Sequence, residues 1–507
     1  MDALCAPRAE HAIEVWRLDV GPSLGGVLKF GTSGLRGLVE DMTDAVCGAH
    51  TAAFLAHLAA DGARGKVVLV GRDLRPSSPR IAAACRDAIR QAGLTAVECG
   101  PLPTPALALE AAARGAPAIM VTGSHIPFDR NGIKFYRPGG EITKADEAGI
   151  LAALEQPDPG AAIAGAEIAD DGARARYLAR YRDFFAADAL AGWRVGVYQH
   201  SAVGRDLLPE ILTALGAETV ALGRSDAFVP IDTEAVRPED EALARNWTAT
   251  HRLDALVATD GDGDRPLIAN ESGTFLRGDL LGVLTARALG ADAVATPISS
   301  NTALERSGWF DRVVRTCIGS PYVIEAMERL SADGARLPVG YEANGGFLLG
   351  GTAAGDGSRT LAPLPTRDAL APMLATLVMA ARDGVPLSAL AARLPARFTA
   401  SDRLQETPPE HSRPFLTELR DNAAAREQLL AALGGPCVAA INATDGVRMT
   451  LAGDEIAHLR ASGNAPELRC YAEAATQERA VEIVKQVLSK AHIVLSNSLS
   501  VSSDSRY

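Results

Sequence analysis

The chain has 507 residues, of which 47% are hydrophobic and 22% are charged, and its formal net charge at pH 7 is −12. This length exceeds what one hydrophobic core supports and predicts three or four domains. The composition is typical of a soluble globular protein, and the acidic charge argues against nucleic acid or an anionic membrane as the main partner. Anionic small molecules stay compatible with it, because local basic loops can override a global charge.

The cysteines and the N-terminal residues favour a cytoplasmic protein. The seven cysteines are scattered without a C-x-x-C pair, which fits reduced thiols better than disulfides or a zinc site. The N-terminal residues MDALCAPRAEHAIEVW carry charges where a signal peptide needs an apolar core. The longest apolar run, near residues 370–381, contains Pro372 and is too short to span a bilayer.

An internal repeat organises most of the chain. Three segments each contain a short apolar strand, a polar turn, an Ala/Leu-rich helix and a second strand, over residues 66–100, 193–223 and 292–319. Such β-α-β units predict parallel pairing and right-handed crossovers, and therefore an α/β sheet in each segment. A helical stretch and another apolar strand follow each unit, and this strand ends in a polar loop. Ligands gather at the carboxyl ends of such strands, so the three loops are expected to face one cleft.

The chain changes character after about Arg393. A hairpin around Thr444-Asp445-Gly446, a Gly/Pro loop and an amphipathic helix predict a smaller α+β domain, and the Ser-rich end is expected to fray. The predicted class is therefore α/β, with three similar α/β domains with mixed sheets plus a smaller C-terminal α+β domain around a central cleft. The predicted domains span residues 1–160, 161–280, 281–393 and 394–507, the last with a flexible tail.

The sequence DGDGDR predicts a metal site. Asp260, Asp262 and Asp264 alternate with glycines, and three carboxylates this close repel one another unless a hard cation neutralises them. A solvated acidic turn is the plainer interpretation, but the regular alternation after a buried strand argues against it. An EF-hand fails because Arg265 stands where that loop needs glycine, and its flanks resemble strands. Mg²⁺ beside an oxyanion substrate is the preferred interpretation.

The sequence TGSHIP presents Ser124 and His125 at the end of another apolar strand. It lacks the G-x-S-x-G pattern, so a hydrolase triad is a weak hypothesis. A serine shown to a metal loop of a neighbouring domain fits phosphoryl transfer better. Capping of a turn by Ser124, with His125 merely packed, explains this loop alone equally well. Lys134, in the strand that follows, either reaches back as acid, base or phosphate partner or lies on the surface.

The sequence RASGNAPELR has the composition of a phosphate cradle. A glycine-kinked loop with backbone N–H groups, a hydroxyl and two guanidiniums suits a phosphate, although two arginines on a loop are often only solvated. The residues concerned are Arg460, Ser462, Gly463, Asn464 and Arg469. The loop FGTSGLRG has similar content, with Arg36, and GYEANGG supplies Glu342 and Asn344, whose side chains suit the hydroxyls of a sugar.

In this order the motifs resemble the α-D-phosphohexomutase family, the phosphoglucomutases and phosphomannomutases, from Phe30 to about Tyr471. That family has four domains around a cleft and moves phosphate between the 1- and 6-positions of a hexose through a hexose 1,6-bisphosphate. The resemblance implies that Ser124 carries the transferred phosphoryl group, next to His125. It also implies that Mg²⁺ is bound by Ser124, Asp260, Asp262 and Asp264, and that the phosphoserine is contacted by Arg36 and by Lys134, the latter as proton shuttle. The sugar contacts that it implies come from Arg265, Glu342 and Asn344. The other phosphate would be clamped by Arg460, Ser462, Gly463, Asn464 and Arg469.

The sequence departs from the family pattern at two positions, one near the transferred phosphoryl group and one in GYEANGG. Ile126 stands where the family usually has asparagine, and Gly346 where many bacterial members have histidine, while GYEANGG shares E-A-N-G with acetylglucosamine phosphomutases. The expected function is a phosphohexomutase, with mannose favoured and glucose as an alternative. A metal-dependent sugar phosphatase, a phosphoacetylglucosamine mutase and a silent sugar-phosphate binding protein remain as alternatives. The expected partners are sugar phosphates, with hexose 1,6-bisphosphate as activator, for a monomer or homodimer.

Overall fold

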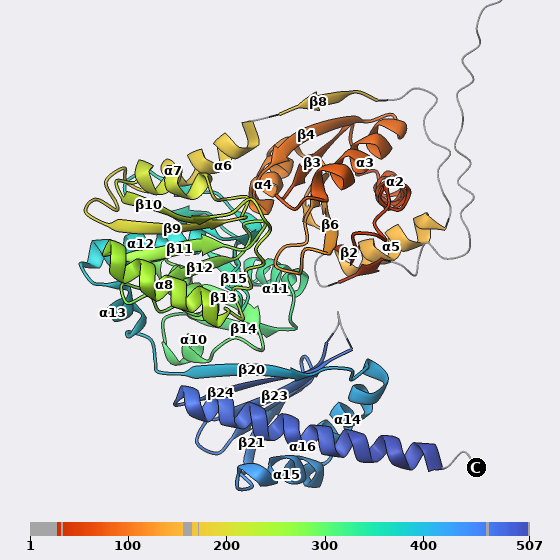
Figure 1. Ribbon diagram of the computed structural model, residues 1–507, viewed down its shortest axis with the longest axis vertical. Coiled ribbons are helices and arrows are strands. Elements are labelled where there is room, and N and C mark those ends of the chain that lie inside the picture. The colour runs from red at the N-terminus through yellow and green to blue at the C-terminus, as the bar shows by residue number, and fades with distance from the viewer. Residues whose placement is uncertain (1–27, 32–33, 156–164, 171, 463–465, 505–507) are drawn as a thin grey trace, which may run out of the picture.

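The computed structural model describes residues 28–31, 34–155, 165–170, 172–462 and 466–504 (Figure 1). It confirms the predicted fold class, with three α/β domains and a C-terminal α+β domain. Within the residues described, no helix combines the length and hydropathy that a membrane span requires.

The first domain contains an eight-stranded sheet of order β1-β2-β6-β5-β3-β4-β8, with β7 paired to β6. Its strands are β1 (Lys29–Phe30), β2 (Leu35–Leu38), β3 (Val67–Arg72), β4 (Thr95–Pro101), β5 (Ala118–Val121), β6 (Arg130–Arg137), β7 (Gly140–Glu141) and β8 (Glu167–Ala169). Its helices are α2 (Asp44–Ala60), α3 (Ser78–Gln91), α4 (Thr104–Arg114) and α5 (Lys144–Leu154).

The second domain contains a four-stranded sheet of order β10-β9-β11-β12. Its strands are β9 (Arg194–His200), β10 (Glu218–Arg224), β11 (Ala255–Thr259) and β12 (Pro266–Ala269), and its helices are α6 (Gly172–Arg182), α7 (Leu207–Ala214) and α8 (Pro238–His251).

The third domain contains a five-stranded sheet of order β14-β13-β15-β16-β19 and a two-stranded ribbon. The sheet strands are β13 (Ala293–Pro297), β14 (Arg312–Thr316), β15 (Pro338–Tyr341), β16 (Phe347–Leu349) and β19 (Leu364–Asp368), and the ribbon strands are β17 (Ala353–Ala354) and β18 (Thr360–Leu361). The helices are α9 (Gly278–Leu289), α10 (Ala303–Arg306), α11 (Ser320–Ala332), α12 (Leu370–Asp383) and α13 (Leu387–Ala391).

The fourth domain contains a five-stranded antiparallel sheet of order β20-β24-β23-β22-β21. Its strands are β20 (Phe398–Leu404), β21 (Val438–Asn442), β22 (Val447–Leu451), β23 (Ile456–Ala461) and β24 (Leu468–Ala474). Its helices are α14 (Pro409–Asp421), α15 (Ala423–Leu430), the short η1 (Ala431–Leu433) and α16 (Gln477–Asp504).

The predicted repeat is confirmed in the first three domains. The strands of each β-α-β unit pair in parallel, as β3 with β4, β9 with β10 and β13 with β14. A third parallel strand (β5, β11 or β15) follows in each domain, and after a turn the chain returns as its antiparallel partner (β6, β12 or β16). These third strands are buried throughout, as expected for apolar runs that are covered on both faces. The turn after each of them carries one of the predicted polar loops.

One hydrophobic cluster joins the first three domains, and the fourth has a cluster of its own. The joint cluster runs from Leu107 on α4 through Val257 on β11 to Leu374 on α12. The fourth domain packs its sheet under α14 and α16, and Figure 1 shows it below the others, entered through β20. Polar contacts attach it to the third domain, among them those from Thr302 to the carboxylate of Glu473.

The helix α16 continues to Asp504, so the Ser-rich end is helical as far as the structure describes it. The flexibility of this tail stays a prediction. The buried apolar face of this helix extends through Leu488, Ala491 and Leu495, which pack against the sheet. This helical spacing of apolar residues favours a helix despite the Ser-rich composition. The predicted domain boundaries stay a prediction. The boundary at 280/281 falls inside α9, and the boundary at 393/394 falls between α13 and β20.

Candidate active site

The serine loop and the metal loop meet at the strand ends, as predicted. Ser124 is only 1% exposed, and its hydroxyl donates a 2.6 Å hydrogen bond to Oδ2 of Asp260 in the second domain. Three loops follow β5, β11 and β15: the serine loop (residues 122–129), the metal loop (residues 260–265) and the sugar loop (residues 342–346). This hydrogen bond to a carboxylate of another domain argues against the interpretation that Ser124 only caps a turn.

The three aspartates of the metal loop fit a divalent cation. They are fully buried, which rules out a solvated turn, and each offers an oxygen within 4.8 Å of the others. Oδ1 of Asp262 and Oδ1 of Asp264 have no hydrogen-bond partner in the described part of the chain. Burial and the two neighbouring carboxylates raise the pKa of Asp260 well above its usual range. A bound cation would satisfy the orphaned oxygens and relieve this repulsion.

The first domain fixes the metal loop from outside. Thr104, at the start of α4, donates from its hydroxyl to Oδ2 of Asp262 at 2.6 Å and from its backbone N–H to the carbonyl of the same residue at 2.9 Å. A Cβ on Gly261 would lie 2.7 Å from the carbonyl oxygen of Ser124, so only glycine allows this approach. The glycines of DGDGDR therefore serve the contact between domains as well as the curl of the loop.

Ser124 has an unusual backbone conformation. Its φ of 51° is left-handed, a region that non-glycine residues adopt rarely and often at functional sites. Its N–H donates to the hydroxyl of Thr122 at 2.8 Å, and that hydroxyl donates to the buried Asp73 at 2.8 Å. This chain of hydrogen bonds holds the serine toward the second domain. Nδ1 of His125 lies 3.3 Å from the serine Oγ.

Arg75 is a buried organiser of the serine loop that the sequence did not reveal. Its side chain forms a 3.3 Å ion pair with Asp73, and its guanidinium lies 4.0 Å from the ring centre of Phe228 of the second domain. The guanidinium donates to the carbonyls of Ser124 (2.9 Å), Ile126 (2.5 Å), Pro127 (2.7 Å) and Arg130 (3.0 Å). Position 126 thus contributes a backbone carbonyl to the site.

Lys134 lies in the site and not on the surface. It is 5% exposed on β6, and its ammonium donates to Oδ2 of Asp262 and Oδ2 of Asp264, both at 2.7 Å. Burial alone would lower the pKa of Lys134, but the two aspartates outweigh burial and raise it. Lys134 is therefore a cation held between two metal-loop carboxylates.

Other basic side chains lie close to the aspartates of the metal loop. Nε of Arg265 lies 3.9 Å from Oδ2 of Asp260 and 3.7 Å from Oδ1 of Asp264. Arg36 lies half-buried on β2, and burial and the guanidinium of Arg265 lower its pKa to about 10. The same two causes lower the pKa of His125 well below its usual range. At neutral pH Arg36 stays charged and His125 is neutral. The site thus presents several fixed cations to an anionic substrate.

The sugar loop approaches the metal loop through an arginine that the sequence analysis did not single out. Glu342 is 4% exposed and accepts a 2.7 Å hydrogen bond from Nη1 of Arg367, at the end of β19. Arg367 also donates to Oδ2 of Asp264, from Nη2 at 2.8 Å and from Nε at 3.2 Å. The side-chain oxygen of Asn344 accepts from the N–H of Gly346 at 3.0 Å and shapes the turn.

The predicted phosphate cradle lies on the fourth domain. Arg460 on β23 and Arg469 on β24 are direct cross-strand partners, and they form ion pairs with Asp445 at 3.2 Å and Glu467 at 3.1 Å. Ser462 is buried, whereas Gly463 and Asn464 lie outside the described residues. Among the residues described, neither arginine forms a hydrogen bond or ion pair with the serine or metal loop.

A cavity lined by residues of the second, third and fourth domains connects the cradle strands with the sugar loop. Its lining includes Ala343 of the sugar loop together with His458 of β23 and Tyr471 of β24. The sugar loop therefore faces the reactive loops through Glu342 and the fourth domain through Ala343.

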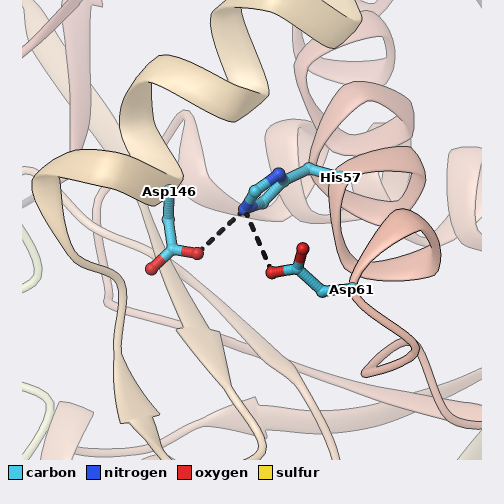
Figure 2. Close-up of side chains that lie close together, drawn as sticks. All are labelled: His57, Asp61 and Asp146. Atoms are coloured by element: carbon cyan, nitrogen blue, oxygen red, sulfur yellow. Dashed lines mark hydrogen bonds and ion pairs between the residues drawn. The ribbon is translucent and has the colours of Figure 1, made fainter.

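A second cluster, His57, Asp61 and Asp146, also has metal-ligand chemistry (Figure 2). The guanidinium of Arg137 already supplies a positive charge to its two carboxylates. Nε2 of His57 lies 2.8 Å from Asp146 and 3.9 Å from Asp61, and Arg137 donates to both carboxylates. Burial opposes ionisation, but hydrogen bonds from Thr143, His57 and Arg137 lower the pKa of Asp146 to about 2. Asp146 also closes the capping box of α5, so this cluster joins α2 to α5.

Comparison with known proteins agrees with this geometry. Four models of the phosphoglucomutase/phosphomannomutase domains match, for α/β/α domains I, II and III over residues 27–160, 175–273 and 277–398 and for the C-terminal domain over residues 415–490. The chain is 47% identical to a phosphomannomutase of Salmonella muenchen over 467 residues, 91% of this chain and 95% of the relative.

Two further proteins extend the comparison. A phosphomannomutase of Sinorhizobium fredii is 45% identical over 470 residues, 91% of this chain and 98% of its own. The crystal structure of a phosphoglucomutase/phosphomannomutase family protein from Burkholderia thailandensis superposes with a TM-score of 0.73 at 22% identity, over 90% of this chain and 96% of that one. The latter supports the fold alone.

Proposed function

The chain belongs to the phosphoglucomutase/phosphomannomutase family, and we propose that it interconverts hexose 1-phosphate and hexose 6-phosphate with mannose favoured and glucose as the alternative. The observation that carries the proposal is the 2.6 Å contact between the Ser124 hydroxyl and Asp260 of the metal loop. The two phosphomannomutase relatives, at 47% and 45% identity, support mannose as the sugar.

Ser124 carries the phosphoryl group in this proposal. The bond from phosphorus to the serine Oγ breaks as a bond from phosphorus to the free sugar hydroxyl forms. Lys134 acts as the proton shuttle: its ammonium gives a proton to the departing Oγ, and the amine so formed takes the proton of the attacking hydroxyl and becomes an ammonium again. Nδ1 of half-buried His125 lies 3.3 Å from the same oxygen. In this proposal the guanidinium of Arg36 contacts the phosphoserine.

Charge compensation comes from the metal loop and its basic neighbours. Asp260, Asp262 and Asp264, with an oxygen of phosphorylated Ser124, would hold Mg²⁺, which when bound supplies positive charge that stabilises the phosphoryl group in transfer. The guanidinium of Arg265 lies within 4 Å of two of these carboxylates and faces the same space.

Two further regions handle the sugar and the phosphate that does not react. Arg265, Glu342 and Asn344 contact the sugar hydroxyls, and the cradle consisting of Arg460, Ser462, Gly463, Asn464 and Arg469 holds the other phosphate. The product of the first transfer is a hexose 1,6-bisphosphate. It reverses its orientation in the cleft and then gives its other phosphate back to Ser124. Added hexose 1,6-bisphosphate is therefore the expected activator. A cytoplasmic location and a monomeric or homodimeric state complete the proposal.

Phosphorus NMR tests this function. The protein is incubated with Mg²⁺, a catalytic amount of hexose 1,6-bisphosphate, and mannose 1-phosphate, glucose 1-phosphate or acetylglucosamine 1-phosphate in separate samples. Growth of a 6-phosphate resonance, faster with mannose, is the expected result. Release of inorganic phosphate alone would identify a phosphatase, and turnover of acetylglucosamine 1-phosphate alone a different mutase. No turnover of any of these sugars would leave only a binding protein.

A further inference from the structure

Arg367 connects two loops that belong to different domains. It is 3% exposed at the end of β19 in the third domain, and its guanidinium reaches Asp264 of the metal loop and Glu342 of the sugar loop. Oδ2 of Asp264, which accepts from Arg367, also accepts from Lys134 at 2.7 Å. The same guanidinium thus contacts the reactive centre on one side and the sugar loop on the other.

Gly346 provides the space for this arginine. A Cβ at position 346 would lie 2.7 Å from Cδ, 2.9 Å from Cγ and 3.0 Å from Cβ of Arg367, closer than real side chains approach. The φ of Gly346 lies outside the range that glycine alone favours, so the glycine is needed for space and not for its conformation. The space that a side chain at position 346 would need is thus occupied by the stem of Arg367.

Both neighbours of Arg367 are anchored to other domains. Thr366 donates to Glu141, on β7 of the first domain, at 2.7 Å. Asp368 is buried and accepts from the hydroxyl of Tyr177, on α6, at 2.5 Å, as well as from Tyr181. The backbone that carries Arg367 is therefore fixed on both sides, which suits a side chain that sets the spacing between two loops.

We propose that Arg367 is a positioning residue for sugar recognition: it orients the carboxylate of Glu342 and holds the sugar loop in register with Asp264. The inference rests on the proposed function, in which Glu342 contacts the sugar and Asp264 belongs to the metal loop. A buried guanidinium suits this task because its planar array of donors can serve two carboxylates at once, whereas an ammonium acts as a point charge.

The first test is the choice between two sugars. In Arg367→Lys, the KM for mannose 1-phosphate should rise by about tenfold or more, the scale of one lost charge-assisted hydrogen bond. The ratio of kcat/KM for mannose 1-phosphate to that for glucose 1-phosphate should move toward one. The matched control is Arg315→Lys, because Arg315 on β14 bonds Glu305 and backbone carbonyls of its own domain. This control should keep the parent ratio. An unchanged ratio in soluble Arg367→Lys would overturn the inference.

Two double variants show whether Arg367 acts through Glu342 and needs Gly346. Adding Arg367→Lys to Glu342→Gln should not change the sugar ratio beyond the effect of Glu342→Gln alone; additive effects would contradict positioning. Gly346→Ala should displace the Arg367 side chain and change the sugar ratio as the loss of that arginine does, without adding a charge. In the Arg367→Ala background, Gly346→Ala should change the sugar ratio little further. If the parent protein interconverts neither sugar phosphate, the proposed function itself fails and this inference with it. If the parent is active and Gly346→Ala keeps its sugar ratio, only the inference fails.

Discussion

The hydroxyl of Ser124 donates to Oδ2 of Asp260 over 2.6 Å, although the two residues are 136 positions apart and lie in different sheets. The contact depends on a left-handed serine on one side and on a glycine beside the aspartate on the other. Neither loop alone forms the site. The reactive centre is created where the strand ends of two repeats meet.

Mg²⁺ should stabilise the protein through the metal loop. A ligand that binds only the folded state raises the unfolding temperature with concentration. We expect this rise in the parent and its loss in Asp262→Asn, which neutralises a buried oxygen that lacks a hydrogen-bond partner in the described structure. Differential scanning calorimetry with and without EDTA measures it. The control Asp61→Asn alters the second acidic cluster and should keep the rise; loss of the rise in that variant alone would contradict the assignment.

Lys134→Arg should separate charge from proton transfer. A guanidinium still neutralises Asp262 and Asp264 but does not release a proton at neutral pH, so kcat should fall by about a hundredfold, the usual scale of acid–base catalysis. Steady-state kinetics with mannose 1-phosphate measures this effect. Lys144→Arg is the control, because that ammonium pairs with Glu147 near the surface. An unchanged kcat in Lys134→Arg would remove Lys134 as the shuttle.

Arg75→Lys should impair the serine loop. A lysine ammonium has three donors and cannot replace a guanidinium that bonds the carbonyls of Ser124, Ile126, Pro127 and Arg130. We expect a loss of unfolding free energy of about 3 kcal/mol or more, since buried carbonyls lose charged donors. Urea unfolding measures the loss, with Arg80→Lys on the surface of α3 as control. Equal losses of unfolding free energy in both variants would show that the buried hydrogen bonds of Arg75 contribute no more to stability than a surface arginine does.

Acid should weaken the fourth domain through His458. Its Nε2–H donates to the carbonyl of Asp445 at 2.6 Å, and burial lowers its pKa to about 4 from the ordinary 6.5. Because the folded state favours the neutral ring, this contribution is complete above pH 6.5 and decreases as the pH falls toward 4. Between pH 7 and pH 5 the loss should be about 2 kcal/mol.

Urea unfolding at these two pH values, in the parent and in His458→Gln, measures this loss. The variant has no ring to protonate and should lose less stability than the parent over the same interval. The same pH dependence in both proteins would refute the role of His458.

The sequence predicted the parts of the site that lie in contiguous motifs after buried strands. Ser124, the metal-loop aspartates and Lys134 belong to such segments, and the β-α-β repeat predicted where their strands end. Arg75 and Arg367 escaped notice because an arginine in a polar turn or before an aspartate resembles a surface residue. Only the tertiary fold shows that both side chains point inward. Arg75 bonds carbonyls of its own domain, and Arg367 bonds carboxylates of two domains.

The most direct test of the account is the location of phosphate during turnover. The protein is incubated with hexose 1,6-bisphosphate labelled in its phosphates, digested, and mapped by mass spectrometry. The account predicts the label on Ser124, its transfer to added hexose monophosphate, and no label or turnover in a folded Ser124→Ala variant. A label on another residue, or normal turnover in Ser124→Ala, would contradict it.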